Sequence, residues 1–271
     1  EDVKKLAQDR FYGDIPQTRY LLDPMLFINL NNELGKRIVG EEGPRKAVLL
    51  AACGIYVEDY DGETGLCAPN LLINADSSAG KDYVVRNILK LFPKDKVITK
   101  TKMTPEAFTY SMMEAAKQDS FTWSGKLFYL PDVSQSLLDG DTFKKMMSEG
   151  SDASVVIRQK VHEIRIPGRP IFFATTAKAK PNDEILNRFD LVALTETPDQ
   201  TRKILRFHAE KEAGDGQPSR YSSQAIGTFS ALKRVRVRIP FANAVAENVP
   251  VDDVRVRRSY NRLLAYIKNS A

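Results

Sequence analysis

The sequence predicts an α/β fold in which a largely parallel sheet is covered by helices on both faces. Short apolar runs such as LLI and LFYL alternate along the chain with longer segments whose apolar residues recur every three or four positions. This succession is typical of strands that alternate with helices. Runs that are apolar throughout favour strands buried on both faces, as in parallel sheets. The length of 271 residues is enough for one large domain or two modest ones.

The chain opens with helical patterns. Residues 2–13 predict a short helix, and residues 24–37 predict a second one. Residues 44–60 predict a stronger helix, because a proline stands near the start and apolar residues follow at helical spacing. The Asp61-Gly62 pair then marks a turn.

The middle of the chain is expected to hold the sheet. The apolar runs predict strands at residues 71–74, 96–99, 127–130, 170–175 and 191–194. Helical spacing predicts helices at residues 81–92, 105–117, 142–147, 200–211 and 256–269. Thr104 stands where it can cap the helix at 105–117. Residues 154–166 alternate with a period of two, which predicts a strand or hairpin, and the polar residues 214–219 predict a linker.

The stretch NLLINADSSAGKDYVV, residues 70–85, looks like a phosphate-binding loop with two departures from the motif. Ala75 stands in place of the first Gly, and Asp82 stands in place of the Ser or Thr. The usual pattern is GxxxxGK[ST], placed after a strand and before a helix. Backbone N–H groups at such a turn bind anions, Gly80 lets the backbone approach a phosphate, and Lys81 would reach the β- and γ-phosphates. We therefore expect ATP to bind at Ala75, Asp76, Ser77, Ser78, Ala79, Gly80, Lys81, Asp82 and Tyr83.

The departure with chemical consequences is Asp82, which replaces the hydroxyl residue that normally ligates Mg²⁺. A carboxylate can also ligate the metal, but it adds negative charge beside the phosphates. A second acid, Asp132, ends the segment GKLFYLPDV, where motor ATPases usually have an Asp-Glu pair. One acid of such a pair holds the metal and the other polarises the attacking water. The lone Asp132 could serve the metal, the water or both, and we expect Mg²⁺ at Asp82 and Asp132.

Composition excludes several other classes. The hydrophobic fraction of 42% and charged fraction of 28% are typical of globular proteins, and no apolar run approaches the roughly 20 residues of a membrane span. The start is unlike a signal peptide, so we expect a cytoplasmic protein. Since it is Glu1 and not Met, we expect a piece of a longer protein. Cys53 and Cys67 give no disulfide framework or zinc spacing, and two His exclude a His-rich metal site.

The net charge of +5 is unevenly placed. The C-terminal part contains KRVRVR at residues 233–238 and RVRR at residues 255–258. Two basic runs in one segment favour a nucleic-acid partner, although a solvated basic face explains a single run equally well.

Three further segments follow in order: PIFFATT at residues 170–176, NRFDL at residues 187–191, and the start of a helix after Asp199. This succession resembles the AAA+ ATPase module of the minichromosome maintenance (MCM) helicases and their relatives on mobile genetic elements. The segments IPFANAVAE and VRRSYNRLLAYIKNSA also resemble the C-terminal part of plasmid and phage relatives. The resemblance covers roughly residues 38–271.

The resemblance implies an AAA+ P-loop NTPase that forms a homo-oligomer, a hexameric ring with ATP between subunits. Thr175 or Thr176 would orient water or the γ-phosphate in the same subunit, and Arg188 would act as arginine finger from the neighbour. A second arginine, Arg257 or Arg258, would also reach the γ-phosphate. The implied domains are an N-terminal helical segment (1–37), the ATPase core (38–213) and a linker with a partial, basic, lid-like region (214–271).

The hairpin expected at residues 154–166 takes the place of the MCM pore hairpin, which grips DNA. The resemblance assigns its tip to residues 158–162, of which Arg158 and above all Lys160 would bind single-stranded DNA through phosphates without sequence preference. The function implied is an ATP-driven helicase for the DNA replication of a mobile element.

Three alternatives remain open at this stage. The first is an AAA+ machine that remodels proteins and lacks the DNA-gripping hairpin. The second is a small-molecule kinase, which would not depend on an arginine from a neighbour. The third is a non-hydrolysing assembly module, since both departures from the motifs fall on the metal chemistry.

Overall fold

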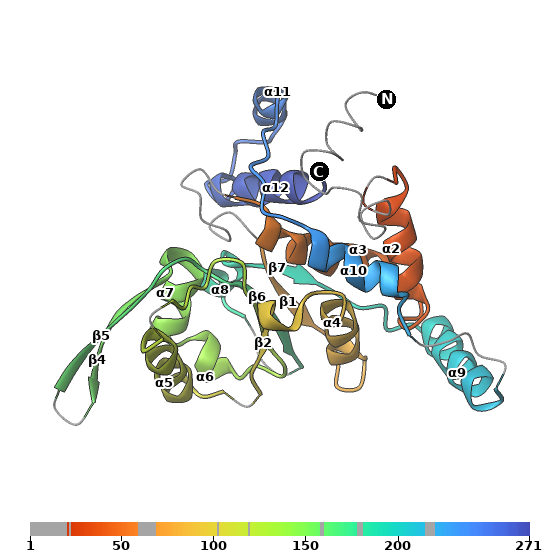
Figure 1. Ribbon diagram of the computed structural model, residues 1–271, viewed down its shortest axis with the longest axis horizontal. Coiled ribbons are helices and arrows are strands. Elements are labelled where there is room, and N and C mark those ends of the chain that lie inside the picture. Colours follow the sequence, from red (N-terminus) through yellow and green to blue (C-terminus); the bar gives the residue numbers. More distant parts are fainter. Residues whose placement is uncertain are drawn as a thin grey trace.

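A central sheet, two helical layers, two projecting elements and a C-terminal pair of helices make up the part of the chain that the structure describes (Figure 1). This computed structural model describes residues 21, 23–58, 69–101, 103–118, 120–157, 160–177, 181–214 and 220–271, and only the backbone of residues 149 and 151–162. The helix expected at residues 2–13, the turn at residues 61–62 and the predicted hairpin residue Arg158 lie outside the described residues.

The sheet has five strands, all paired in parallel, in the order β2-β3-β6-β1-β7. Its strands, in that order across the sheet, are Val97–Thr99, Leu127–Leu130, Ile171–Thr176, Asn70–Asn74 and Phe189–Val192. Because all five run the same way, the residues that follow β1, β3 and β6 gather at one edge of the sheet, which we call the carboxyl edge. The residues that precede the strands lie at the opposite, amino edge.

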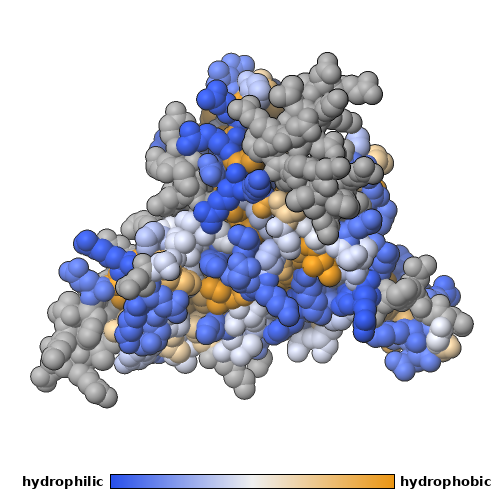
Figure 2. Space-filling view, viewed as in Figure 1, coloured by the Kyte–Doolittle hydropathy of each residue, from blue (hydrophilic) through white to orange (hydrophobic). Residues whose placement is uncertain are grey.

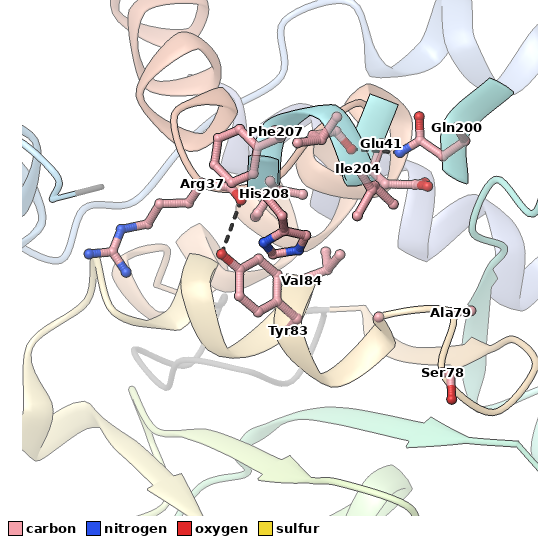
Figure 3. A pocket seen from close by; sticks show the side chains of 13 residues that line it. Arg37, Glu41, Ser78, Ala79, Tyr83, Val84, Gln200, Ile204, Phe207 and His208 are labelled. Atoms are coloured by element: carbon pink, nitrogen blue, oxygen red, sulfur yellow. Dashed lines mark hydrogen bonds between the residues drawn. The ribbon is translucent and has the colours of Figure 1, made fainter. Parts of the chain in front are cut away.

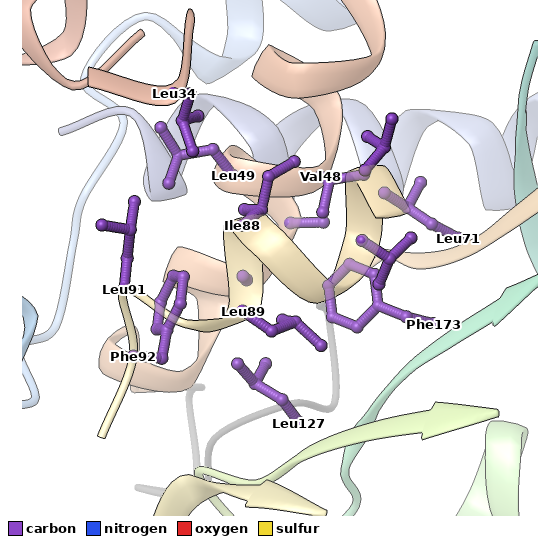
Figure 4. Packing of buried hydrophobic residues seen from close by; sticks show 14 of the residues in the cluster. Leu34, Val48, Leu49, Leu71, Ile88, Leu89, Leu91, Phe92, Leu127 and Phe173 are labelled. Atoms are coloured by element: carbon purple, nitrogen blue, oxygen red, sulfur yellow. The ribbon is translucent and has the colours of Figure 1, made fainter. Parts of the chain in front are cut away.

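The first helical layer covers the sheet face to which the odd-numbered residues of β3 point. Leu127 and Tyr129 join its core, together with Leu71 of β1 and Phe173 of β6 (Figure 4). Its helices are α2 (Leu26–Gly35), α3 (Glu42–Cys53), α4 (Lys81–Leu89) and α10 (Ser223–Ala231), with the single turns η3 (Gly54–Tyr56) and η4 (Lys94–Lys96) beside them.

The second layer covers the face to which Phe128 and Leu130 point. Its helices are α5 (Pro105–Ala116), α6 (Gln135–Leu138), α7 (Asp141–Glu149) and α8 (Asp183–Leu186). The core here is rich in aromatic rings. Trp123, the single tryptophan of the chain, is 2% exposed and packs 4.7 Å from Phe121 and 5.7 Å from Phe128 between ring centroids.

Two elements project from opposite ends of the molecule (Figure 1). One is the antiparallel hairpin of β4 (Ser151–Ile157) and β5 (Lys160–Ile166), and the other is helix α9 (Pro198–Glu212). The hairpin is anchored at its base, where Ile164 and Ile166 are buried in the second layer and the N–H of Trp123 donates to the carbonyl of Pro167 at 2.9 Å.

The C-terminal part adds α11 (Ala242–Glu247) and α12 (Val256–Asn269). Helix α12 packs on α3 and η3. On the face shown in Figure 2, hydrophilic residues cover much of the surface and the larger apolar patches lie on the central body. Within the described residues, none of the helices has the length and apolar character needed to cross a membrane.

The α/β fold, with its parallel sheet between helices, and the hairpin are confirmed, as is the cap on α5, where Thr104 Oγ1 accepts from the N–H of Ala107 at 3.1 Å. Several element predictions are wrong in detail. The helix expected to reach residue 60 ends at Cys53, because the chain tightens into η3 and Val57 then bridges to Val235. The last strand starts at Phe189 rather than residue 191. The helices α6 and α8, each of four residues, were not expected, and neither were α10 and α11.

Candidate nucleotide-binding site

The predicted phosphate-binding loop lies where its motif requires, between β1 and α4 at the carboxyl edge of the sheet. Ser78 and Gly80 both have positive φ, 75° and 84°, so the loop turns sharply just before the helix begins at Lys81. Ser77, Ser78 and Gly80 are exposed. The first amides of a helix lack intrahelical acceptors and form a binding site for anions. The start of α4 therefore offers a backbone cradle for a phosphate.

Lys81 is folded back against this loop. Its side chain is buried, with 8% of the residue exposed, and its Nζ lies 3.4 Å from the carbonyl oxygen of Asp76. The other side of the loop is braced by Glu196, whose Oε1 accepts from the N–H of Asp76 at 2.8 Å. An ammonium bonded to a neutral carbonyl is available to anionic phosphates, so the position of Lys81 suits the role expected from the sequence.

Asp82 is held by hydroxyl groups from two strands. Its Oδ1 accepts from the hydroxyl of Tyr129 on β3 at 2.8 Å and from the hydroxyl of Thr175 on β6 at 2.5 Å. Burial first, and then the hydrogen bond to Asp82, raise the pKa of Tyr129 well above its usual value. The tyrosine hydroxyl therefore keeps its proton and acts as a donor.

Thr175 also holds the predicted catalytic acid. It is fully buried, and its Oγ1 accepts from the N–H of Asp132 at 3.0 Å, while its carbonyl accepts from the N–H of Val133 at 2.8 Å. Asp132 has a φ of 50° and an exposed side chain. Asp is among the few residues that tolerate this conformation. The structure thus joins Asp82, Asp132 and Thr175 in one network at the end of β3 and β6.

The oxygen donors of this network fit Mg²⁺. In the described part of the chain, no three His, Cys, Asp or Glu side chains gather into a metal cage. Magnesium needs none, because it usually binds through one or two carboxylates, the phosphates of the substrate and water. Asp82, which the hydroxyls of Tyr129 and Thr175 hold at the start of α4, supplies one carboxylate of this kind, and Asp132 adds an exposed one just after β3.

A cavity of about 270 Å³ opens beside the loop and has the size of a small ligand pocket. Figure 3 shows Tyr83 of α4 and His208 of α9 facing each other across it. Its lining comes from three separate segments and comprises Arg37, Ile38, Val39, Glu41, Ser78, Ala79, Gly80, Tyr83, Val84, Gln200, Ile204, Phe207 and His208. A largely apolar recess next to a phosphate cradle suits the base of a nucleotide.

The wall formed by residues 38–41 is tied to α9. Gln200 donates from Nε2 to the carbonyl of Val39 at 2.6 Å, and the carboxylate of Glu41 accepts from the N–H of Thr195 at 3.0 Å. Gly40 has a φ of 64°, and a Cβ there would lie 2.5 Å from the Gln200 amide oxygen. The fit between this turn and α9 therefore requires glycine.

Arg188 lies away from this site. It directly precedes β7, and Phe189 pairs with Asn70 at the start of β1, so Arg188 is at the amino edge. Its Nη1 forms an ion pair with Glu184 at 3.1 Å, and its Nε donates to Ser148 Oγ at 3.0 Å. Arg188 therefore cannot reach the loop of its own chain, which is separated from it by the length of the strand.

The start of α12 is at the same edge. Arg262 of α12 forms an ion pair with Asp190 of β7 at 2.9 Å and donates to the carbonyl of Phe189 at 3.0 Å. Arg257 and Arg258 lie one turn earlier on α12 and are exposed. The expected second arginine is thus grouped with Arg188 and not with the phosphate loop of the same chain.

The predicted DNA-binding residue Lys160 is the first residue of β5 and pairs with Ile157 of β4. This register places Lys160 at the projecting end of the hairpin, as expected.

Sequence reasoning missed the hydroxyl of Tyr129 and most of the cavity lining. In the sequence Tyr129 is one residue of an apolar run, and a phenol inside such a run is a signal that a hydrogen-bond partner lies nearby. Ile38, Val39, Ile204 and Phe207 gave no local signal, because they meet only in the folded chain.

Comparison with known proteins agrees with this geometry. A comparison with curated proteins finds no match. The family model described as the MTBMA_p00010 P-loop domain matches residues 50–231, more than half of the chain. The match spans the loop from Ala75 to Asp82, the strands that position Asp132 and Thr175, and helix α9. The chain is a P-loop NTPase domain, and it belongs to the MTBMA_p00010 P-loop domain family.

Proposed function

We propose that this protein is an ATP-driven DNA motor of the AAA+ type, similar to the MCM helicases, in which a neighbouring copy completes each ATP site. The observation that carries the proposal is the placement of Arg188 at the amino edge while the phosphate loop lies at the carboxyl edge. An arginine so placed can serve only the loop of another copy. A ring of identical subunits, six in the family that the sequence resembles, brings the two edges together repeatedly.

Within one subunit the residues divide the work of phosphoryl transfer. Lys81 and the first amides of α4 would hold the phosphates, and the recess between Tyr83 and His208 would hold the adenine. Asp132, fixed through its backbone by Thr175, would polarise the attacking water. The carboxylates of Asp82 and Asp132 would be available to hold Mg²⁺, which would supply positive charge to offset the charge that develops on the phosphates.

Arg188 of the neighbouring copy would stabilise the charge of the transition state, which contributes on the order of 10³ to 10⁵ in rate. It must first exchange its present partner, because Glu184 holds its guanidinium. Such an exchange couples hydrolysis to docking of the next subunit. The exposed Arg258 would add a second positive charge from the same edge.

The motor is proposed to move along DNA. The hairpin projects from the body of the molecule with Lys160 near its end (Figure 1). Six copies around a ring would present six such lysines to one channel. Contacts of this kind neutralise phosphates without reading sequence, which suits movement along single-stranded DNA.

The decisive experiment mixes two inactive chains. Arg188→Ala and Lys81→Ala should each abolish ATP hydrolysis, and a mixture should recover part of it, because some sites then combine an intact Lys81 with an intact Arg188. Arg202→Ala, an exposed arginine on α9, is the matched control and should remain active alone. Co-assembly of the two chains is checked by affinity capture with one tagged partner.

Absence of recovery in mixtures that demonstrably co-assemble would contradict the shared site. A single observation favours a second function, a nucleotide-binding assembly module that does not hydrolyse. Pro131 occupies the position where motor ATPases have the first acid of their pair. That function predicts ATP-dependent assembly without phosphate release from the parent protein.

A further inference from the structure

The residue after Lys81 and the residue after β3 both depart from the usual motif, and the departures are complementary. The usual loop has a hydroxyl after the lysine, and the usual strand ends in a carboxylate that holds the metal. Here a carboxylate, Asp82, follows the lysine, and Pro131 follows the strand. The loop has thus gained a carboxylate, and the end of the strand has lost one.

The alternation of β3 shows which position would face the metal. Side chains along a strand point alternately to its two faces. Leu127 and Tyr129 point to the layer that contains α4, whereas Phe128 and Leu130 point to the other layer. The next residue on the α4 side is Pro131, which offers no metal ligand. The strand therefore presents no carboxylate to the phosphate loop from its own end.

Asp82 lies close enough to the end of β3 to take over the role of that missing carboxylate. Its Oδ1 is bonded by the hydroxyls of Tyr129 and Thr175, so the carboxylate is fixed between β3 and β6. In the part of the chain that the structure describes, Oδ2 of Asp82 accepts no hydrogen bond. One oxygen orients the group and the other is available to a cation.

We propose that Asp82 is the metal-anchoring carboxylate of this site, a role moved from the end of β3 to the start of α4, and that Asp132 is left to act on water. The proposal rests on the proposed ATP site. Tyr129 and Thr175 are then positioning residues, which orient Asp82 without touching the metal. The arrangement makes Asp82 a required group, and its charge beside the phosphates is balanced only when the cation is bound.

The test measures metal binding directly, with Mn²⁺ as a spectroscopic probe for Mg²⁺. Electron paramagnetic resonance gives the affinity of Mn²⁺ for the complex with ADP, and calorimetry in EDTA gives the affinity for ADP alone. Asp82→Asn preserves the shape of the side chain and an oxygen for both hydroxyls. It should weaken Mn²⁺ binding ~10-fold or more, while ADP affinity in EDTA stays the same or improves because a negative charge is lost.

Two variants serve as comparisons. Asp132→Asn should change Mn²⁺ affinity by less than about twofold, because its carboxylate acts on water. Asp141→Asn, which removes an exposed carboxylate from the first turn of α7, should leave both affinities unchanged.

The exchange itself can also be reversed. Asp82→Thr should lose Mn²⁺ affinity, and adding Pro131→Asp to it should restore that affinity, because hydroxyl and carboxylate then stand in their usual places. If the double variant fails to fold, the comparison of Asp82→Asn with Asp132→Asn decides alone.

The proposal is overturned if Asp82→Asn keeps Mn²⁺ affinity within about twofold, or if Asp132→Asn loses it instead. In both cases ADP still binds in EDTA, so the proposed ATP site stands. If the parent protein binds no ADP under any condition, the ATP site itself fails and this inference fails with it.

Discussion

At the residue scale, we expect nucleotide binding to be most sensitive to substitution of Lys81, because Lys81 is the one side chain of the loop that is both buried and cationic. Lys81→Ala should lower ADP affinity ~10- to 100-fold, since a hydrogen bond to a charged group contributes about 1.5–3 kcal/mol. Isothermal calorimetry measures the change. Lys46→Ala on α3, whose lysine is exposed, is the control and should bind normally. Equal affinities for the two variants would remove Lys81 from the site.

The residues of the loop were predictable because their chemistry is local. Gly80 and Lys81 follow a strand and precede a helix in nine consecutive letters, so spacing alone indicates a phosphate site. The network around Asp82 was not predictable in the same way. Tyr129 and Thr175 lie 47 and 93 residues further along the chain, and only the strand order β3-β6-β1 brings them to α4.

At the element scale, a partly buried ion pair joins α12 to β7. Asp190 and Arg262 retain 25% and 20% side-chain exposure, and Arg262 also donates to the carbonyl of Phe189 at 3.0 Å. Arg262→Met leaves a carboxylate without its cation and should lower the free energy of unfolding by about 2 kcal/mol, less than the loss for a fully buried pair. Urea unfolding measures it, with Arg202→Ala as a surface control expected to change it by under about 0.5 kcal/mol.

The ion pair between Asp190 and Arg262 also predicts how the free energy of unfolding changes with pH. Burial raises the pKa of Asp190 even beside Arg262, so the folded chain holds this proton more tightly than the unfolded chain. Protonated Asp190 therefore contributes to folding stability below the ordinary Asp pKa of about 4. This contribution is lost as the pH rises through the raised pKa that Asp190 has in the folded chain. The deficit of Arg262→Met should therefore be larger at pH 7 than at pH 4, and adding Asp190→Asn should remove this difference. A deficit independent of pH would contradict the assignment.

The hairpin provides the second prediction at this scale. Lys160→Ala should leave the basal ATPase intact, remove its stimulation by single-stranded DNA and flatten the dependence of DNA binding on salt, because fewer phosphates are neutralised. Lys145→Ala, an exposed lysine on α7, should behave like the parent. If DNA binding by Lys160→Ala depends on salt concentration as steeply as binding by the parent, Lys160 does not contact DNA. The basic residues 233–238 would then be the next candidates.

Elements with a strong period were predictable, and short or shifted ones were not. The hairpin at residues 154–166 was expected from alternation alone, and it begins three residues earlier than expected. The four-residue helices α6 and α8 are too short to show a period of 3.6 residues. The start of β7 was missed because Asp190 interrupts its apolar run, and the arginine that pairs with it lies on α12.

At the scale of the whole molecule, the two edges of the sheet carry the parts that the proposed function combines into one site between copies. The loop is at the carboxyl edge, and Arg188 and the start of α12 are at the amino edge. ATP bound at the loop would therefore lie between copies. We expect ATP with Mg²⁺ to raise the mass measured by light scattering to that of several chains, and to leave Lys81→Ala unchanged. A mass of one chain at saturating ATP and tens of micromolar protein would contradict a shared site.

The fluorescence of the single tryptophan, Trp123, can report on the structure around it without an added label. Trp123 lies among aromatic rings, and its indole Nε1 has no hydrogen-bond partner in the described part of the chain, so its fluorescence should be blue-shifted in the folded state and move to longer wavelength on unfolding. Its backbone is bonded to Pro167 at the base of the hairpin. One emission band can therefore follow both the melting of the second layer and any strain that bound DNA transmits down the hairpin, without a label.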